Sequence, residues 1–170
     1  MPTTTTTTAD DLKVAFAGES QANRKYLAFA AKAEKDGFPQ VARLFRATAE
    51  AETIHAMGHL AAMGAVGSTA DNLKGAVQGE TYEHTEMYPP MLAQAQKEQH
   101  RAKTMFNWAL QVEKVHADLY KKALEAVLAG RDMGTAEIYI CPVCGHLEIG
   151  KPSAKCPVCG LPPEKYRAIA

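Results

Sequence analysis

The chain has 170 residues, 46% of them hydrophobic and 22% charged, and its 19 Lys and Arg balance its 19 Asp and Glu. This length suits a medium-sized domain with a small module beside it. The balanced charge argues against a basic surface for nucleic acid or an anionic membrane. No signal peptide or membrane-spanning apolar stretch is recognisable, so a soluble cytoplasmic protein is expected.

The first 130 residues predict a helical bundle. Residues 1–8 are mostly threonine and are expected to be disordered. From residue 10 to residue 130 the sequence is rich in Ala, Leu, Glu, Gln and Lys, with apolar residues at helical spacing. Breaks at residues 37–39, 64–69 and 96–100 separate four predicted helices, and Gly130 closes the fourth. Residues 9–133 are therefore interpreted as a four-helix bundle.

Two adjacent prolines interrupt the third predicted helix. Pro89 and Pro90 lack the backbone N–H that a helix interior needs. They are expected to bend or end this helix soon after Tyr88.

Two Glu-x-x-His motifs lie on the second and fourth predicted helices. They pair Glu52 with His55, and Glu113 with His116. Residues three apart on a helix point to the same side, so each motif presents a carboxylate and an imidazole at one level. Each motif therefore predicts half of a metal site.

Three more glutamates interrupt the apolar faces of the first and third predicted helices: Glu19, Glu80 and Glu83. An unpaired buried carboxylate costs at least several kcal/mol, so five of them require a cation. Two ferric ions with an oxo or hydroxo bridge would roughly balance this charge. Glutamate and histidine at helical spacing are the ligands of di-iron and di-manganese bundles. The pattern favours a dinuclear site over a solvated charged face.

An internal repeat supports this interpretation. A shift of 61 positions places Glu19 on Glu80, Glu52 on Glu113 and His55 on His116. Two matching helical hairpins would surround one centre with pseudo-twofold symmetry. Glu83 has no mate, because its counterpart is Ala22, so it would make the two metal positions unequal.

Other polar residues near these motifs receive weaker assignments. His59 is expected in the core or at its rim, and His84 and His100 are expected at the surface, none of them binding metal. Tyr26 and Tyr88 lie within two turns of Glu19 and Glu83. Either tyrosine could hydrogen-bond a ligand carboxylate, or serve only in packing.

All four cysteines lie in the last part of the chain, residues 134–170, which is interpreted as a separate module. Short strands are predicted at residues 138–140 and 147–149. Two Cys-Pro-Val-Cys-Gly knuckles contain Cys141, Cys144, Cys156 and Cys159. Four thiolates at this spacing predict a tetrahedral metal site, with His146 a loop residue outside the ligand set. Iron is favoured because it could pass electrons to the bundle, while zinc also accepts four thiolates.

Taken together, these motifs resemble the rubrerythrin family over nearly the whole chain. They are Glu19, Glu52-Thr-Ile-His55, Glu80-Thr-Tyr-Glu83, Glu113-Lys-Val-His116 and the two cysteine knuckles. The resemblance implies a mainly α protein, a ferritin-like four-helix bundle followed by a small rubredoxin-like β/loop domain. It further implies a non-haem diiron peroxidase that reduces hydrogen peroxide to water in oxidative stress defence.

The resemblance also implies roles for individual ligands. Glu52 and Glu113 would bridge two irons, and Glu80 with His116 would complete one of them. The other iron would take Glu19 with Glu83 or His55, as alternative ligands that exchange on reduction. A single iron held by the four cysteines would supply electrons.

The partners implied by the resemblance are hydrogen peroxide, a second copy of the chain in a homodimer, and a reduced electron carrier. The carrier would be of the rubredoxin or flavoprotein reductase type, which makes the enzyme NAD(P)H-linked. In such dimers the rubredoxin-like domain of one subunit is expected near the diiron site of the other. Two other classes stay open: a ferritin relative that oxidises or stores iron, and a non-enzymatic binding protein with a zinc ribbon.

Overall fold

A computed structural model describes residues 6–169 of the chain. It confirms the predicted mainly helical architecture with a small cysteine-containing module at the C-terminal end. The chain divides into two compact units, Met1–Gly67 and Ser68–Ala170, and each is described by itself. None of the helices in the described part of the chain is both long and apolar enough to span a membrane.

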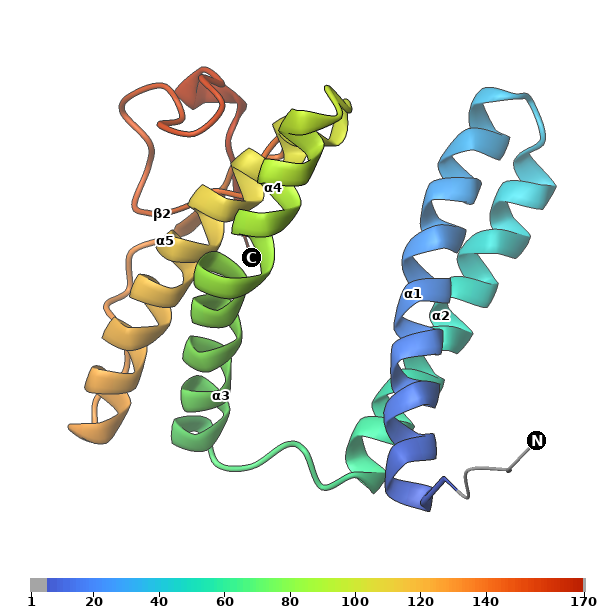
Figure 1. Cartoon of the computed structure of the whole chain (residues 1–170), viewed down its shortest axis with the longest axis horizontal. Coiled ribbons are helices and arrows are strands. Elements are labelled where there is room, and N and C mark those ends of the chain that lie inside the picture. The colour runs from blue at the N-terminus through green and yellow to red at the C-terminus, as the bar shows by residue number, and fades with distance from the viewer. Residues whose placement is uncertain (1–5, 170) are drawn as a thin grey trace. The chain divides into compact units, whose positions relative to one another are not determined.

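The first unit is a hairpin of two long helices, α1 (Thr8–Lys35) and α2 (Pro39–Ala62), which run side by side (Figure 1). Thr7 caps α1 in a capping box with Asp10, so the helix begins within the segment expected to be disordered, of which residues 1–5 lie outside the described part. Gly37 has a φ of 82° at the predicted break. The buried positions of these helices are mostly alanines, whose small side chains permit close packing: Ala30, Ala33, Ala42, Ala49 and Ala56.

The second unit begins with a helical hairpin of its own. One arm consists of α3 (Thr69–Tyr82), the π-helix η1 (Glu83–Met87) and α4 (Tyr88–Lys97). The returning arm is α5 (Ala102–Leu128), and Gly130 follows it with a φ of 68°. The predicted breaks at residues 64–69 and 96–100 are thus confirmed.

The expectation for Pro89 and Pro90 is wrong in one respect. The distortion precedes the prolines, as the π-helix, and α4 continues through them to Lys97. Both prolines lie in the first turn of α4, where the absence of an N–H costs little. The N–H of Tyr88 binds the carbonyl of Glu83, five residues earlier, which is the wide turn of a π-helix.

The π-helix inserts one residue into the internal repeat. Glu19 and Glu80 are 61 positions apart, whereas the helix-ending residues Gly37 and Gln99 are 62 apart and both have positive φ. Phe45 and Phe106, after the corner, are again 61 apart. The two hairpins therefore match in their ligands and in the positive φ of Gly37 and Gln99. The second hairpin has one extra residue before Gln99 and one residue fewer between Gln99 and Phe106.

The C-terminal module contains a three-stranded antiparallel sheet in the order β2-β1-β3. The strands are β1 (Ile138–Ile140), β2 (Leu147–Ile149) and β3 (Arg167–Ile169), and Tyr139 pairs with Glu148 on one side and Ala168 on the other. The first two strands were predicted, and the third was not. A short 3₁₀ turn, η2 (Pro163–Lys165), precedes β3.

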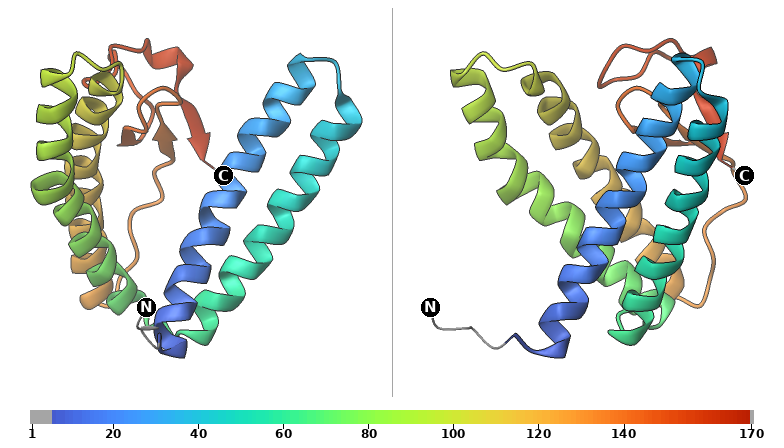
Figure 2. Two further views of the ribbon diagram at one scale, coloured as in Figure 1. Left: turned by 45° about the vertical axis from the view of Figure 1, so that its right-hand side comes forward. Right: turned by 90° about the vertical axis from the view of Figure 1, so that its right-hand side faces the viewer.

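The module packs against α5 within the second unit (Figure 2). Val112 of α5 is 2% exposed and shares a buried cluster with Cys141, Cys144, Cys156 and Tyr166. A β-carbon on Gly145 would lie 3.8 Å from Val112 Cγ1, so the first cysteine knuckle lies directly against the helix. This contact positions the module beside the motif Glu113-x-x-His116.

Candidate metal centres

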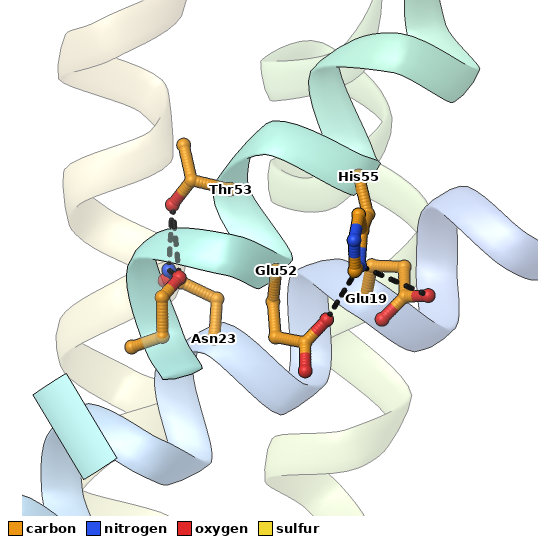
Figure 3. A network of polar contacts seen from close by, with 6 residues as sticks. Glu19, Asn23, Glu52, Thr53 and His55 are labelled. Atoms are coloured by element: carbon orange, nitrogen blue, oxygen red, sulfur yellow. Dashed lines mark hydrogen bonds and ion pairs between the residues drawn. The ribbon is translucent and has the colours of Figure 1, made fainter. Parts of the chain in front are cut away.

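The first hairpin brings three of the predicted ligands together. Glu19 of α1 and Glu52 and His55 of α2 offer ligand atoms that all lie within 4.8 Å of one another. His55 Nδ1 lies 3.0 Å from Glu52 Oε2 and 3.9 Å from Glu19 Oε1 (Figure 3). We call these residues the first half-site.

The second hairpin repeats this arrangement with the ligands related by 61 positions. Glu80 of α3 and Glu113 and His116 of α5 also lie within 4.8 Å of one another and form the second half-site. His116 Nδ1 lies 2.8 Å from Glu113 Oε2 and 3.7 Å from Glu80 Oε2. The corresponding distances in the two hairpins differ by only 0.2 Å. The repeat in sequence is thus a repeat in geometry.

The two half-sites differ in exposure. The His55 side chain is 54% exposed, whereas that of His116 is 19% exposed. Burial and the neighbouring Glu113 carboxylate raise the pKa of Glu80, an effect that His116 partly offsets. Carboxylates crowded in this way favour a cation among them.

Glu83 lies near the second half-site but outside its cluster of three ligands. It is the first residue of the π-helix and is half-buried. Burial and the charge of Glu80 raise its pKa, while His116 lowers it. This carboxylate therefore lies beside the second half-site, and the first half-site has no equivalent carboxylate because Ala22 stands at the matching position.

In each hairpin a polar side chain near the half-site bonds across to the opposite helix, and these contacts were not predicted. Asn23 is buried, and its Nδ2 donates to the carbonyl of Ala49 at 2.7 Å and to Thr53 Oγ1 at 2.8 Å (Figure 3). At the equivalent place in the second hairpin, His84 Nδ1 lies 2.8 Å from the carbonyl oxygen of Leu110. The surface assignment of His84 was wrong, because it is half-buried and ties α5 to the opposite arm. The shift of 61 that relates Asn23 to His84 was the signal in the sequence.

Tyr26 and Tyr88 occupy matching positions against aromatic rings. The ring centroid of Tyr26 is 6.2 Å from that of Phe45, and the centroid of Tyr88 is 6.1 Å from that of Phe106. Burial raises the pKa of Tyr88, and the charge of Glu113 adds to this effect, so its hydroxyl keeps its proton. The expectation that either tyrosine hydrogen-bonds a ligand carboxylate stays a prediction.

The four cysteines converge as the knuckles predicted. Their sulfurs lie within 4.8 Å of one another, with 3.5 Å between Cys141 and Cys159 and between Cys144 and Cys156. A tetrahedral metal with bonds of about 2.3 Å to sulfur would separate its ligands by roughly 3.8 Å. The sulfurs therefore fit a four-thiolate metal closely.

A buried polar chain lies behind one of these sulfurs. His146 Nδ1 is 3.0 Å from the Tyr166 hydroxyl, and both residues are buried. Burial by itself would raise the pKa of Cys156, but hydrogen bonds from Tyr166 and from backbone amides lower it to about 6. Burial lowers the pKa of His146, which favours the neutral ring. His146 was expected in a loop outside the ligand set, and its contact with Tyr166 was not foreseen.

A single histidine connects the half-site of the second hairpin to the module. His116 Nε2 lies 3.2 Å from the carbonyl oxygen of Gly145, the residue that follows Cys144. Histidines that bind metal through one ring nitrogen commonly donate the other N–H to a backbone carbonyl. This contact therefore suits a His116 that offers Nδ1 to a metal.

Comparisons with known proteins agree with these donor sets. The family profile described as Rubrerythrin matches residues 10–124, and the one described as Rubrerythrin, rubredoxin-like domain matches residues 139–167. The chain is 38% identical to Rubrerythrin-2 of Clostridium acetobutylicum, over 95% of this chain and 96% of that protein. It is 37% identical to Nigerythrin of Nitratidesulfovibrio vulgaris, over 95% of this chain and 86% of that protein.

A solved structure extends the likeness to three dimensions. The structure described as the fully reduced, all-ferrous state of nigerythrin matches with a TM-score of 0.58 and 35% sequence identity. The match covers 98% of this chain and 89% of that one.

Proposed function

The chain belongs to the rubrerythrin family, and we propose that it is a non-haem diiron peroxidase that reduces hydrogen peroxide to water in oxidative stress defence. The main support is the pair of half-sites, which repeat the same Glu, Glu and His with nearly equal distances. A Glu from each of two helices and a Glu-x-x-His from each of two others is the donor set of diiron carboxylate bundles.

Each ligand then has a proposed role. Glu52 and Glu113 would be shared by the two irons, Glu80 and His116 would help to hold one, and Glu19 with Glu83 or His55 would help to hold the other. The bound irons would supply the two electrons that, with two protons, convert one hydrogen peroxide to two waters. The first half-site supports an exchange of ligands, because His55 is the most exposed of its three residues.

The protein's own groups would hold protons beside the site. The raised pKa values of Glu80 and Glu83 make these carboxyls easier to protonate than an ordinary glutamate before metal enters. The Tyr88 hydroxyl keeps its proton, because burial and the nearby charges of Glu113 and Glu83 raise its pKa. A tyrosine in this place can orient a carboxylate by donating a hydrogen bond.

Electron entry through a four-cysteine iron is the second part of the proposal. The module is packed on α5, and the path from Cys144 through the backbone of Gly145 to His116 contains one non-covalent step of 3.2 Å. This arrangement supports a relay within the second unit of one chain. The expected placement of the module beside the site of another subunit stays a prediction.

The remaining parts of the proposal concern the cellular setting. A reduced carrier of the rubredoxin or flavoprotein reductase type, linked to NAD(P)H, would reload the four-cysteine iron. The cytoplasm is the proposed location, since the thiols would stay reduced there. A homodimer is the proposed assembly.

Anaerobic stopped-flow spectroscopy tests the proposed function. The iron-loaded, fully reduced protein is mixed in separate experiments with hydrogen peroxide and with oxygen, while the ferric-thiolate absorption is followed. We expect this absorption to return much faster with peroxide. A faster reaction with oxygen would instead favour a ferritin-like iron oxidase, and a colourless zinc-loaded module would contradict the relay.

A further inference from the structure

We infer that two copies of this chain exchange helical hairpins, so that the first half-site of one copy is completed by the second half-site of the other. The first hairpin comprises α1 and α2, and the second comprises α3, η1, α4 and α5. The inference rests on the proposed diiron function and concerns which chains build each site.

Each half-site is incomplete as a dinuclear centre. It offers three ligand residues from two helices, whereas the diiron carboxylate set requires ligands from four helices. Each hairpin must therefore meet another hairpin with its ligands at the same level. The question is whether that hairpin belongs to the same chain.

The connection between the hairpins is short and partly used by helix caps. Six residues, 63–68, separate the end of α2 from the start of α3. The N–H groups of Gly64 and Ala65 bind back to the carbonyls of Ala61 and Leu60, and Ser68 caps α3 through the N–H of Asp71. Even if it were fully extended, the chain from the end of α2 to the start of α3 would span at most about 25 Å.

The ferritin-like arrangement needs a longer connection. In that fold a long crossover joins the two hairpins, which makes the second and third helices parallel. Glu52 and His55 lie about 13 Å before the end of α2, and Glu80 lies roughly 16 Å after the start of α3, at 1.5 Å per residue. A crossover would have to span about 29 Å along the bundle, in addition to 8–10 Å between the helix axes. The six-residue connection is too short.

Exchange removes this obstacle. When the two hairpins of one chain enter different bundles, the connection joins the bundles and makes no crossover. Short hinges favour exchange of this kind, and exchange of identical elements gives a closed twofold dimer. Each bundle then carries one complete ligand set, and the contact between His116 and Gly145 keeps each module on the bundle that contains its own second hairpin.

A complementation experiment tests the exchange. One variant combines Glu19→Ala with Glu52→Ala, and its match in the repeat combines Glu80→Ala with Glu113→Ala. The two chains carry different affinity tags, are produced together, and mixed dimers are isolated through both tags. Bundle iron is measured as iron beyond the one atom per chain in the four-cysteine site, together with the Mössbauer signature of a coupled iron pair.

The expected result is recovery only in the mixed dimer. Each variant alone has a defect in every bundle and should hold no iron pair. In an exchanged mixed dimer one bundle combines both defects and the other has none, so bundle iron should reach about half that of the native dimer. If the native protein holds iron pairs and the mixed dimer holds none, the exchange is wrong. If the native protein holds no iron pair, the proposed function fails instead.

A longer connection provides an independent measurement. An insertion of about twelve Gly and Ser residues between Ala65 and Val66 would let both hairpins of one chain enter the same bundle. Introduced into both variants, it should reduce the recovered bundle iron several-fold. The same insertion between Arg131 and Asp132, which follow α5, is the matched control and should leave recovery unchanged. Equal recovery with both insertions would show that the connection does not select the exchange.

Discussion

His116 contacts both parts of the second unit, with Nδ1 2.8 Å from Glu113 Oε2 and Nε2 3.2 Å from the carbonyl oxygen of Gly145. A proton on Nε2 satisfies the carbonyl and leaves Nδ1 free for a metal, so the module determines the tautomer of a half-site residue. The same contact places the four-cysteine site next to the bundle ligands. The proposed electron transfer from the module to the bundle therefore depends on how firmly the module is held on α5.

Val112→Ala should loosen this attachment. Val112 is buried between α5 and the cysteine knuckles, and its truncation should lower the free energy of unfolding by about 1–3 kcal/mol. Peroxide-driven reoxidation of the four-cysteine iron, followed by stopped-flow, should slow at the same time. Val14→Ala is the control, because Val14 is 73% exposed and its change should stay within about 0.5 kcal/mol. Unaltered reoxidation in a destabilised Val112→Ala protein would argue against a relay through this contact.

Glu83→Ala should leave iron in the bundle and slow peroxide turnover. Glu83 has no mate in the first hairpin and lies outside the cluster of Glu80, Glu113 and His116. We therefore expect the other ligands to hold the metals without Glu83, while the two metal positions lose the inequality that Glu83 would give them. Steady-state peroxidase assays and iron analysis measure the two effects. Glu86→Ala, an exposed change in the same π-helix, should preserve turnover, and equal rates in the two variants would refute the special role of Glu83.

Cys156→Ser should block electron entry through the module without unfolding the helices. The sulfur of Cys156 lies 3.5 Å from that of Cys144, and a serine oxygen is a harder and less acidic ligand than a thiolate, so iron in this site should be held more weakly and be harder to reduce. Turnover driven by a protein electron carrier should stop, while the circular dichroism of the helices is retained. A small chemical reductant that reaches the bundle directly should restore peroxide consumption. Carrier-driven turnover in this variant would show that electrons enter elsewhere.

Tyr166→Phe should lower the reduction potential of the four-cysteine iron. The change removes a hydrogen bond to Cys156 and leaves His146 buried without its partner, at a cost of about 1–3 kcal/mol. Hydrogen bonds to the sulfurs stabilise the reduced, more negative site, so their loss favours the oxidised form. Spectroelectrochemical titration measures the shift. Tyr139→Phe, which removes an exposed hydrogen bond to Glu137 two residues earlier in the chain, should leave the potential unchanged.

Asn23→Leu should destabilise the first hairpin. Asn23 joins α1 to the carbonyl of Ala49 and to Thr53, and a leucine would remove both of these cross-helix hydrogen bonds, leaving only the bond from Thr53 to Ala49 within α2. The expected loss is about 1–3 kcal/mol in chemical denaturation. Ser20→Ala is the control, because Ser20 bonds only to the carbonyl of Phe16 in its own helix. Equal losses in both variants would mean that the cross-helix bond contributes nothing beyond a local one.

Local patterns in the sequence were sufficient for most elements and ligands. Helical spacing, Gly37 and Gly130 placed the helices, and the cysteine knuckles predicted a cluster of thiols that the structure contains. The shift of 61 predicted two matching ligand sets, and each hairpin brings its own set together. These features depend on residues within one helix, one hairpin or one knuckle, so spacing alone describes them.

Contacts between distant segments needed the tertiary structure. Pro89 and Pro90 marked a distortion, but its form as a π-helix before them, where His84 contacts the carbonyl of Leu110 on α5, was not predicted. The three residues of β3 carry no strand signal strong enough to predict, and they pair only because β1 offers an open edge. Similarly, the contact between His116 and Gly145 could not be predicted from the sequence around His116. The two residues are 29 positions apart, and folding brings the carbonyl to the imidazole. The sequence by itself identified the candidate metal ligands, because their spacing is local, and the tertiary structure decided which of them lie next to the cysteine module.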